Sequence, residues 1–378
     1  MEKTKEIVEA YGACNNVGDL CLKYGYKNVL LVTDKTLFSL GLHNNVVNSL
    51  EKSGIKYAIF NDIASEPNIE IIENGRRALN ENNSDAIIAL GGGAVMDSCK
   101  IIAAGGRLKK KKTKKLLKKI LIVKNKTLPM ITIPTTAGTG AEMTIASMVT
   151  NHKDRKQSVV IHGLNVVSVV LDGELTINTP LGISCACAID AFSHGIEGVV
   201  ASVKSSEDDL KKSMECVRLV LENLPKIIEN PKDEKSRQNM IIAANLGGNA
   251  INKQLAGNVH AFAHTIGAKY HIPHGNAIAM SVLPVMNFQK HKCLKKLAML
   301  SRYCGYCSDE ICDLDAANIL FSKIQDLIDL CKFERKCIIL KEDYLDVAHG
   351  VAMDSINYSA PIVLKNKDIY KILDEINK

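Results

Sequence analysis

Short apolar runs alternate with amphipathic helical patterns along the first half of the chain. The first three runs begin about 29 residues apart, which is the length of a β-α-β unit. Between them, residues 37–53 and 68–80 place apolar side chains at helical spacing. Because the runs are apolar on both faces, they predict parallel strands buried beneath helices. The predicted strands lie at residues 28–33, 57–60, 85–90, 129–134 and 166–171.

The pattern changes after Pro180, where the strand-like runs give way to long helical stretches. Apolar side chains recur at helical spacing over residues 183–203, 208–229 and 236–254, and the same kind of pattern continues to the end of the chain. A chain of 378 residues is long enough for two domains. We therefore expect an α/β domain over residues 1–179 and an all-α domain over residues 180–378.

The composition places the chain among ordinary globular proteins. Its 46% hydrophobic and 24% charged residues exclude a disordered chain. No apolar run approaches the ~20 residues of a membrane span, and the charged start MEKTKEIV is unlike a secretory signal. We therefore expect a cytoplasmic protein with no membrane partner. Twelve cysteines in such a chain predict reduced thiols, and the cluster at residues 304–312 lacks an evident fourth metal ligand.

The net charge of +7 comes from one segment. Eight lysines fall between Lys109 and Lys119, and removing these eight charges from +7 leaves −1. A basic run can bind nucleic acid, but no aromatic residues interleave here to stack on bases. We interpret the run as a solvated surface and expect no nucleic-acid partner.

Two loops that follow predicted strands suit a bound nucleotide. The first, GGGAVMD, begins with Gly91, Gly92 and Gly93 and leads into a predicted helix. Glycines allow close approach of the backbone to a phosphate, and a helix N-terminus supplies N–H donors. The second loop, PTTAGTGAE, spans residues 134–142 and carries small and hydroxyl side chains. An ordinary strand-to-helix loop with a threonine cap is the alternative interpretation of the second loop.

Acidic and histidine side chains occur at metal-ligand spacing in the second half. Asp190 and His194 lie at i and i+4 of a predicted helix, so they share one face. An ordinary Asp–His surface pair would have the same spacing. Four of the ten histidines fall within fifteen residues of an otherwise small and apolar stretch: His260, His264, His271 and His274. Asp190, His194 and two of these four would form an Asp/His3 site that suits Fe(II), Zn(II) or a neighbouring ion.

These motifs together give a family resemblance. The chain resembles the iron-containing (group III) alcohol dehydrogenases over nearly its whole length. The matching stretches, in order, are VTDK (32–35), GGGAVMD (91–97), PTTAGTGAE (134–142), DAFSHGIE (190–197) and HAFAH…PHG (260–275).

The resemblance implies a fold, a metal site and a catalytic residue. It implies an N-terminal Rossmann-like NAD-binding domain and an all-α C-terminal domain, with the active-site cleft between them. The implied catalytic residue is His264, which would lie near the nicotinamide and transfer protons without binding the metal. The implied metal ligands are Asp190, His194, His260 and His274.

The resemblance also assigns the cofactor positions. Gly91, Gly92 and Gly93 would hold the pyrophosphate, and Asp97 would anchor their turn. Asp34 would bind the adenosine ribose, which favours NAD(H), with NADP(H) as the alternative cofactor. The remaining implied cofactor residues are Thr135, Thr136, Thr139 and Lys156. One departure is Ala94, which stands where the family usually has serine and removes one donor to the phosphate.

The resulting expectation is an NAD(P)-dependent alcohol dehydrogenase, or aldehyde reductase, of the EC 1.1.1 type. It would transfer a hydride between NAD(H) and a small primary alcohol or its aldehyde, with Fe(II) as the expected metal and Zn(II) as the alternative. The alternative functions are a glycerol dehydrogenase-like zinc enzyme and a dehydroquinate synthase-like NAD and metal enzyme. The family also implies a homo-oligomer, a dimer or larger.

Overall fold

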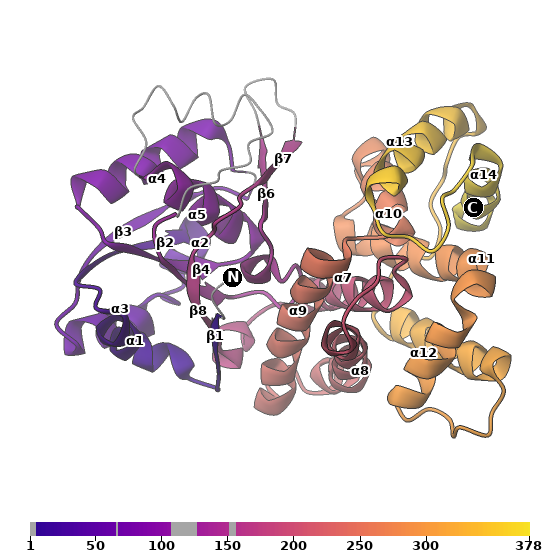
Figure 1. Ribbon diagram of the computed structural model, residues 1–378, viewed down its shortest axis with the longest axis horizontal. Helices are drawn as coiled ribbons and strands as arrows, with labels where there is room; N and C mark the ends of the chain where they lie inside the picture. Colours follow the sequence, from indigo (N-terminus) through magenta and orange to yellow (C-terminus); the bar gives the residue numbers. More distant parts are fainter. Residues whose placement is uncertain (1–4, 66, 107–126, 151–155) are drawn as a thin grey trace. The chain divides into compact units, whose positions relative to one another are not determined.

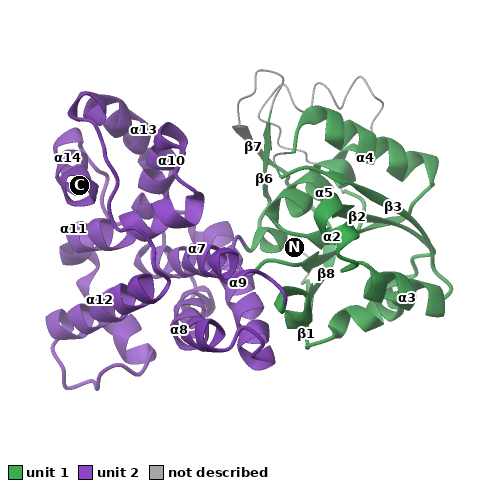
Figure 2. Cartoon of the chain, turned by 180° about the vertical axis from the view of Figure 1, so that it is seen from behind, with its two compact units in different colours: residues 1–136, 140–177 green, residues 137–139, 178–378 purple. Residues whose placement is uncertain are grey.

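The computed structural model describes residues 5–65, 67–106, 127–150 and 156–378. The lysine run at Lys109–Lys119 lies outside the described residues. The chain forms two compact units (Figure 2). We call residues 1–136 and 140–177 the α/β unit, and residues 137–139 and 178–378 the helical unit.

A six-stranded parallel sheet forms the centre of the α/β unit. The strand order is β1-β8-β5-β4-β2-β3, and each neighbouring pair is parallel. The predicted strands are present, while β1 and the antiparallel hairpin β6–β7 were not predicted. The bounds are β1 (Glu6–Glu9), β2 (Asn28–Asp34), β3 (Lys56–Ile63), β4 (Ala86–Gly91), β5 (Met130–Pro134), β6 (Ala146–Thr150), β7 (Lys156–Val160) and β8 (Val166–Leu171).

Both faces of this sheet are buried, as its apolar runs predict. Alternate residues of one strand enter different clusters: Leu30 and Val32 face one core, and Val29 and Leu31 face the other. Helices α4 (Ile69–Glu81) and α5 (Gly93–Gly105) cover the first face, and α1 (Val17–Tyr24) and α3 (Asn44–Lys52) cover the second (Figure 1).

The helix predicted over residues 37–53 is divided in two. The short helix α2 (Lys35–Ser39) is followed by a turn in which Gly41 adopts a φ of 74°, and α3 begins only at Asn44. A left-handed residue cannot continue a right-handed helix, so the periodic pattern spans a turn that it does not reveal.

The helical unit is built around α7 (Leu181–Val200). From Ala188 to Val200 every residue of α7 is buried. The surrounding helices are α8 (Glu207–Glu229), α9 (Glu234–Gln254), α10 (Asn258–Tyr270), α11 (His274–Tyr303), α12 (Asp313–Leu330), α13 (Tyr344–Asn357) and α14 (Asn366–Ile376). Glycine allows close packing here, because a Cβ on Gly195 would lie 3.0 Å from the Ser213 carbonyl oxygen of α8.

By length and composition alone, α7 could cross a membrane. This corrects the expectation that no apolar run approaches the length of a span. In the structure, however, 78% of its apolar window is buried inside the protein. Its apolar character is therefore that of a central core helix.

A buried ion pair ties the β6–β7 hairpin to α5. The Lys100 side chain is only 1% exposed, and its ammonium donates to Asp97 Oδ1 at 3.1 Å and to the Ala146 carbonyl at 2.6 Å. Asp97 Oδ2 accepts from the Met148 amide at 2.8 Å. The Asp97 carboxylate thus holds β6 against the helix that follows the glycine turn.

Replacing Lys100 with Met should lower the free energy of unfolding by about 3 kcal/mol, because Asp97 would lose the charge beside it. Urea denaturation measures this change. The matched control is Lys35→Met, since Lys35 and Asp62 form an ion pair in which both side chains are more than half exposed. That control should cost less than about 1 kcal/mol. Equal losses in the two variants would contradict a structural role for the buried pair.

Candidate active site

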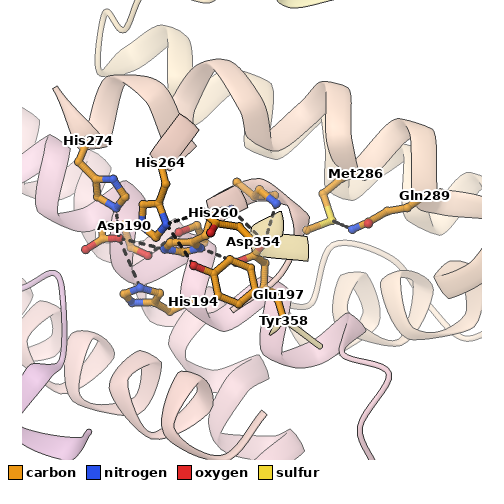
Figure 3. Close-up of polar contacts among 12 residues, drawn as sticks. Asp190, His194, Glu197, His260, His264, His274, Met286, Gln289, Asp354 and Tyr358 are labelled. Carbon is orange, nitrogen blue, oxygen red and sulfur yellow. Dashed lines mark hydrogen bonds and ion pairs between the residues drawn. The ribbon is translucent and has the colours of Figure 1, made fainter. Parts of the chain in front are cut away.

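Three helices of the helical unit bring the predicted metal ligands together (Figure 3). Asp190 and His194 lie one turn apart on α7, His260 lies in the first turn of α10, and His274 is the first residue of α11. A Cβ on Gly275 would lie 2.7 Å from Ala186 Cα, so glycine lets α11 begin this close to α7.

The three imidazoles converge on one carboxylate oxygen. Asp190 Oδ1 lies 3.2 Å from His274 Nε2, 3.4 Å from His194 Nε2 and 3.5 Å from His260 Nε2. Asp190, His194 and His260 are buried, whereas 42% of the His274 side chain is exposed. The cluster is therefore enclosed on the α7 side and accessible at His274.

Burial and charge shift the pKa values of this cluster in opposite directions. Burial raises the pKa of Asp190, but the neighbouring histidines outweigh it and hold that pKa well below its usual range. Burial lowers the pKa of His194 to about 4. Burial also lowers the pKa of His260, but the neighbouring Glu197 and Asp190 outweigh burial and raise that pKa to about 10. At neutral pH, Asp190 is a carboxylate and His194 is a neutral imidazole.

These residues fit a divalent metal ion. One donor atom from each of Asp190, His260 and His274 can be chosen so that all three lie within 4.8 Å of one another. His260 Nε2 is buried and has no hydrogen-bond partner among the described residues, which is costly unless a ligand engages it. Imidazole nitrogens with one carboxylate suit iron(II) or zinc(II). His194 lies outside this group of three, but its Nε2 lies 3.4 Å from Asp190 Oδ1 and its ring stacks on that of His260 with centroids 4.7 Å apart.

Glu197 orients His260 and was not among the predicted site residues. Its Oε2 lies 2.5 Å from His260 Nδ1, and its Oε1 accepts from the Val259 amide at 2.7 Å, so it also caps the first turn of α10. A Cβ on Gly257 would lie 2.7 Å from Glu197 Oε1, which explains the glycine. With Nδ1–H directed at Glu197, His260 Nε2 faces Asp190 and is the ring nitrogen available to a metal ion once its proton is released. Its position seven residues after Asp190, on the same helical face, could have revealed it.

His264 lies beside this cluster but is held by different partners. Its ring stacks on His274 with centroids 5.3 Å apart, and its Nδ1 lies 3.2 Å from Tyr358 Oη and 3.7 Å from Asp354 Oδ2. Although 44% of the side chain is exposed, burial of the ring lowers the pKa of His264. His271, at the C-terminal cap of α10, adopts a left-handed φ of 54° and forms the turn toward α11.

The predicted glycine turn and the first residues of the predicted 134–142 loop meet in the α/β unit. Gly91 ends β4, Gly92 caps α5 and Gly93 begins it, so the N–H groups of α5 are presented at the sheet edge. The Thr135 amide donates to the Gly91 carbonyl at 3.1 Å, and a Cβ on Gly92 would lie 3.3 Å from Thr136 Oγ1. The glycine turn and the threonine loop therefore lie side by side.

Asp34 lies at the end of β2, next to β4 in the sheet. The chain passes from β2 outward to β3 and then returns to β4 on the other side of β2, so the strand order reverses between β2 and β4. Ligands of open parallel sheets bind at the carboxyl ends of strands at such a reversal. The Asp34 carboxylate also caps α2, accepting from the Leu37 amide at 2.9 Å.

Two predicted cofactor residues are placed differently from the rest. Thr139 belongs to the helical unit, together with Ala137 and Gly138. Lys156 begins β7, but its side chain lies outside the described part of the chain.

Both halves of the chain match one known family. Residues 4–173 match the family described as iron-containing alcohol dehydrogenase, and residues 184–377 match the C-terminal domain of the Fe-containing alcohol dehydrogenase family. The chain therefore belongs to the iron-containing alcohol dehydrogenase family. It is therefore an oxidoreductase that acts on alcohols. Its Asp190, His260 and His274 form a group that could hold the metal of an iron-containing enzyme.

Individual relatives agree with this membership. Alcohol dehydrogenase 4 of Saccharomyces cerevisiae (strain YJM789) is 30% identical over 365 residues, covering 96% of this chain and 94% of the yeast protein. The 1,3-propanediol dehydrogenase of Citrobacter freundii is 28% identical over 366 residues, covering 95% and 94%. A solved alcohol dehydrogenase from Oenococcus oeni superposes with a TM-score of 0.88 at 27% identity, covering 98% of each chain. The predicted α/β and all-α halves are confirmed, and the two alternative functions are not favoured.

Replacing Glu197 with Gln should weaken metal retention by about 10–100-fold, because His260 would lose the carboxylate that orients its ring and raises its basicity. Competition with a chelator for bound zinc(II) measures this affinity.

The matched control for this variant is Glu215→Gln on α8. Glu215 accepts hydrogen bonds from Arg218 and Tyr303, and it bonds none of the proposed metal ligands in the hydrogen bonds described for it. Metal affinity in this control should equal that of the unmodified enzyme. An unchanged affinity in Glu197→Gln would remove Glu197 from the support of the site.

Proposed function

We propose that the enzyme transfers a hydride reversibly between NAD(H) and a small primary alcohol or its aldehyde. The observation that carries this proposal is the convergence of three histidines on the Asp190 carboxylate within a chain of this family. The proposed metal ligands are Asp190, His194, His260 and His274, and the proposed metal is iron(II), with zinc(II) as the alternative. The bound metal would act as a Lewis acid that lowers the pKa of the substrate hydroxyl.

Residues around the cluster would leave room for the substrate and accept its proton. The exposed side of His274 leaves room for a substrate oxygen next to the cluster. His264, whose imidazole lies against His274, would accept the hydroxyl proton as the hydride leaves for the nicotinamide. Its lowered pKa keeps it neutral at physiological pH, which is the form that accepts a proton.

The cofactor would be held by the loops at the carboxyl edge of the sheet. Gly91, Gly92 and Gly93 would bind the pyrophosphate through the N-terminus of α5. Asp34 would accept hydrogen bonds from the adenosine ribose. Asp97 would support this turn through α5, and the lining side chains would be Thr135, Thr136, Thr139 and Lys156.

The proposal of a small substrate is supported by some of the relatives and by two apolar residues that the family pattern places toward the substrate. Relatives are named for the small molecules 1,3-propanediol, methanol and lactaldehyde, and one relative is named for long-chain alcohols. Ala146 and Ile251, which the family pattern places toward the substrate, are small and apolar in character and suit a short aliphatic chain. We propose that the enzyme acts in the cytoplasm as a homo-oligomer, without a nucleic-acid or membrane partner.

His264 and His274 should give different losses when each is replaced with Ala. His274→Ala should abolish turnover and sharply reduce metal content, because it removes a proposed ligand. His264→Ala should keep the metal and lower kcat by about 10²–10⁴-fold, because it removes a proton acceptor. Metal analysis and anaerobic assays with added iron(II) or zinc(II) measure both. Full metal content in His274→Ala, or metal loss in His264→Ala, would reverse the corresponding assignment.

Replacing Asp34 with Gly should raise the use of NADPH relative to NADH. A carboxylate at the ribose repels a 2′-phosphate, and each ~1.4 kcal/mol of that repulsion is tenfold in the ratio of kcat/KM values. The lost cap of α2 should cost only a few tenths of a kcal/mol, since glycine is itself tolerated at this position. Kinetics with both cofactors measure the ratio. A wild type that already prefers NADPH would refute the role of Asp34.

A further inference from the structure

His264 is fixed from one side by the last part of the chain. Its Nδ1 lies 3.2 Å from the Tyr358 hydroxyl and 3.7 Å from the Asp354 carboxylate (Figure 3). The Tyr358 ring meets the imidazole edge to face, with centroids 6.4 Å apart. Both partners come from α13 and its C-terminal cap, about ninety residues from His264 along the chain.

The close packing of α13 against α10 creates this contact. A Cβ on Gly350 would lie 2.7 Å from Thr265 Cγ2, so glycine allows α13 to approach α10 next to His264. Asp354 lies four residues after Gly350 and therefore on the same face of α13. The helix thus directs a carboxylate at the imidazole from a fixed position.

The backbone around Tyr358 is anchored on both sides. Ser355 donates from its hydroxyl to Asn258 Oδ1 at the start of α10. The Ser359 amide donates to the Ala256 carbonyl at 3.0 Å, and its hydroxyl accepts from the Val203 amide at 3.0 Å. Ser355 and Ser359 are 2% and 4% exposed, so these bonds are protected from water. The phenol is therefore held in place before any substrate binds.

We propose that Tyr358 and Asp354 are positioning residues that orient the His264 ring for proton transfer. The inference rests on the proposed role of His264. The Asp354 carboxylate places negative charge 3.7 Å from Nδ1, which favours the tautomer of His264 with its proton on Nδ1 and leaves the Tyr358 hydroxyl, at 3.2 Å, as the hydrogen-bond acceptor. Nδ1–H then points to Tyr358 and Asp354, and Nε2 keeps the lone pair that receives the substrate proton. In this arrangement Tyr358 and Asp354 act through the His264 ring.

A double-mutant cycle tests this proposal. Tyr358→Phe and Asp354→Asn should each lower kcat by roughly 10-fold while KM changes less than about twofold, because orientation acts on the chemical step. In the His264→Ala background, the same substitutions should change kcat by less than about twofold, since the ring that they orient is gone. Metal content and the midpoint of unfolding should match those of the unmodified enzyme.

Tyr344→Phe is the matched control. Tyr344 begins α13 and donates from its hydroxyl to Asp374 at 2.9 Å, so the variant also removes a phenol–carboxylate bond from this helix. It should leave kcat unchanged. Histidine ¹⁵N NMR of the zinc-loaded enzyme provides a readout independent of turnover: Tyr358→Phe should shift the tautomer signals of His264, and Tyr344→Phe should not.

The outcomes separate this inference from the proposed function. If His264→Ala loses activity while both Tyr358→Phe and Asp354→Asn keep full kcat, the positioning role is refuted and the proton-transfer role of His264 stands. An equal loss of kcat from Tyr358→Phe in the presence and absence of His264 would also refute it, because Tyr358 would act independently. Full kcat in His264→Ala would refute the proton-transfer role and, with it, the positioning role.

Discussion

Two carboxylates buried in the middle of an apolar helix constrain the whole helical unit. Asp190 and Glu197 lie on α7 within the stretch where every residue is buried, and an unpaired buried carboxylate is strongly destabilising. Histidines from α10 and α11 meet Asp190, and the first turn of α10 meets Glu197. These helices must therefore converge on α7, and the same convergence that satisfies the charges assembles the donors for a metal ion.

The α/β unit meets a different constraint. Its central strands pack apolar side chains against helices on both faces, so most of their side chains are used in packing. Polar groups are left for the loops at the carboxyl ends, where Gly91 and Asp34 end neighbouring strands. Backbone amides and a helix N-terminus then supply what the strand side chains cannot, which is why glycine-rich loops can carry the nucleotide function.

The two polar networks of the helical unit differ in how they are enclosed. The Glu197–His260 contact is fully buried, whereas His264 and Asp354 are each about two-fifths exposed. A buried carboxylate can fix a metal ligand permanently. A partly exposed imidazole that is held by Tyr358 can exchange a proton and still return to one orientation. The sequence places both histidines one helical turn apart, yet their different surroundings suit them to the different roles that we propose for them.

The sequence by itself determined five of the six parallel strands, the change from an α/β half to a helical half, and the histidines that gather at the candidate metal site. Apolar periodicity and i, i+4 spacing are local properties, so they can be read along the chain. Only the tertiary structure selected Glu197 as the partner of His260, placed Tyr358 and Asp354 against His264, and paired Lys100 with the β6 backbone. The first two contacts join residues 63 and 94 positions apart, and such pairs depend on how whole helices pack. Local periodicity carries no information about that packing, which is set by buried volume and by the close approaches that glycines such as Gly257 and Gly350 allow.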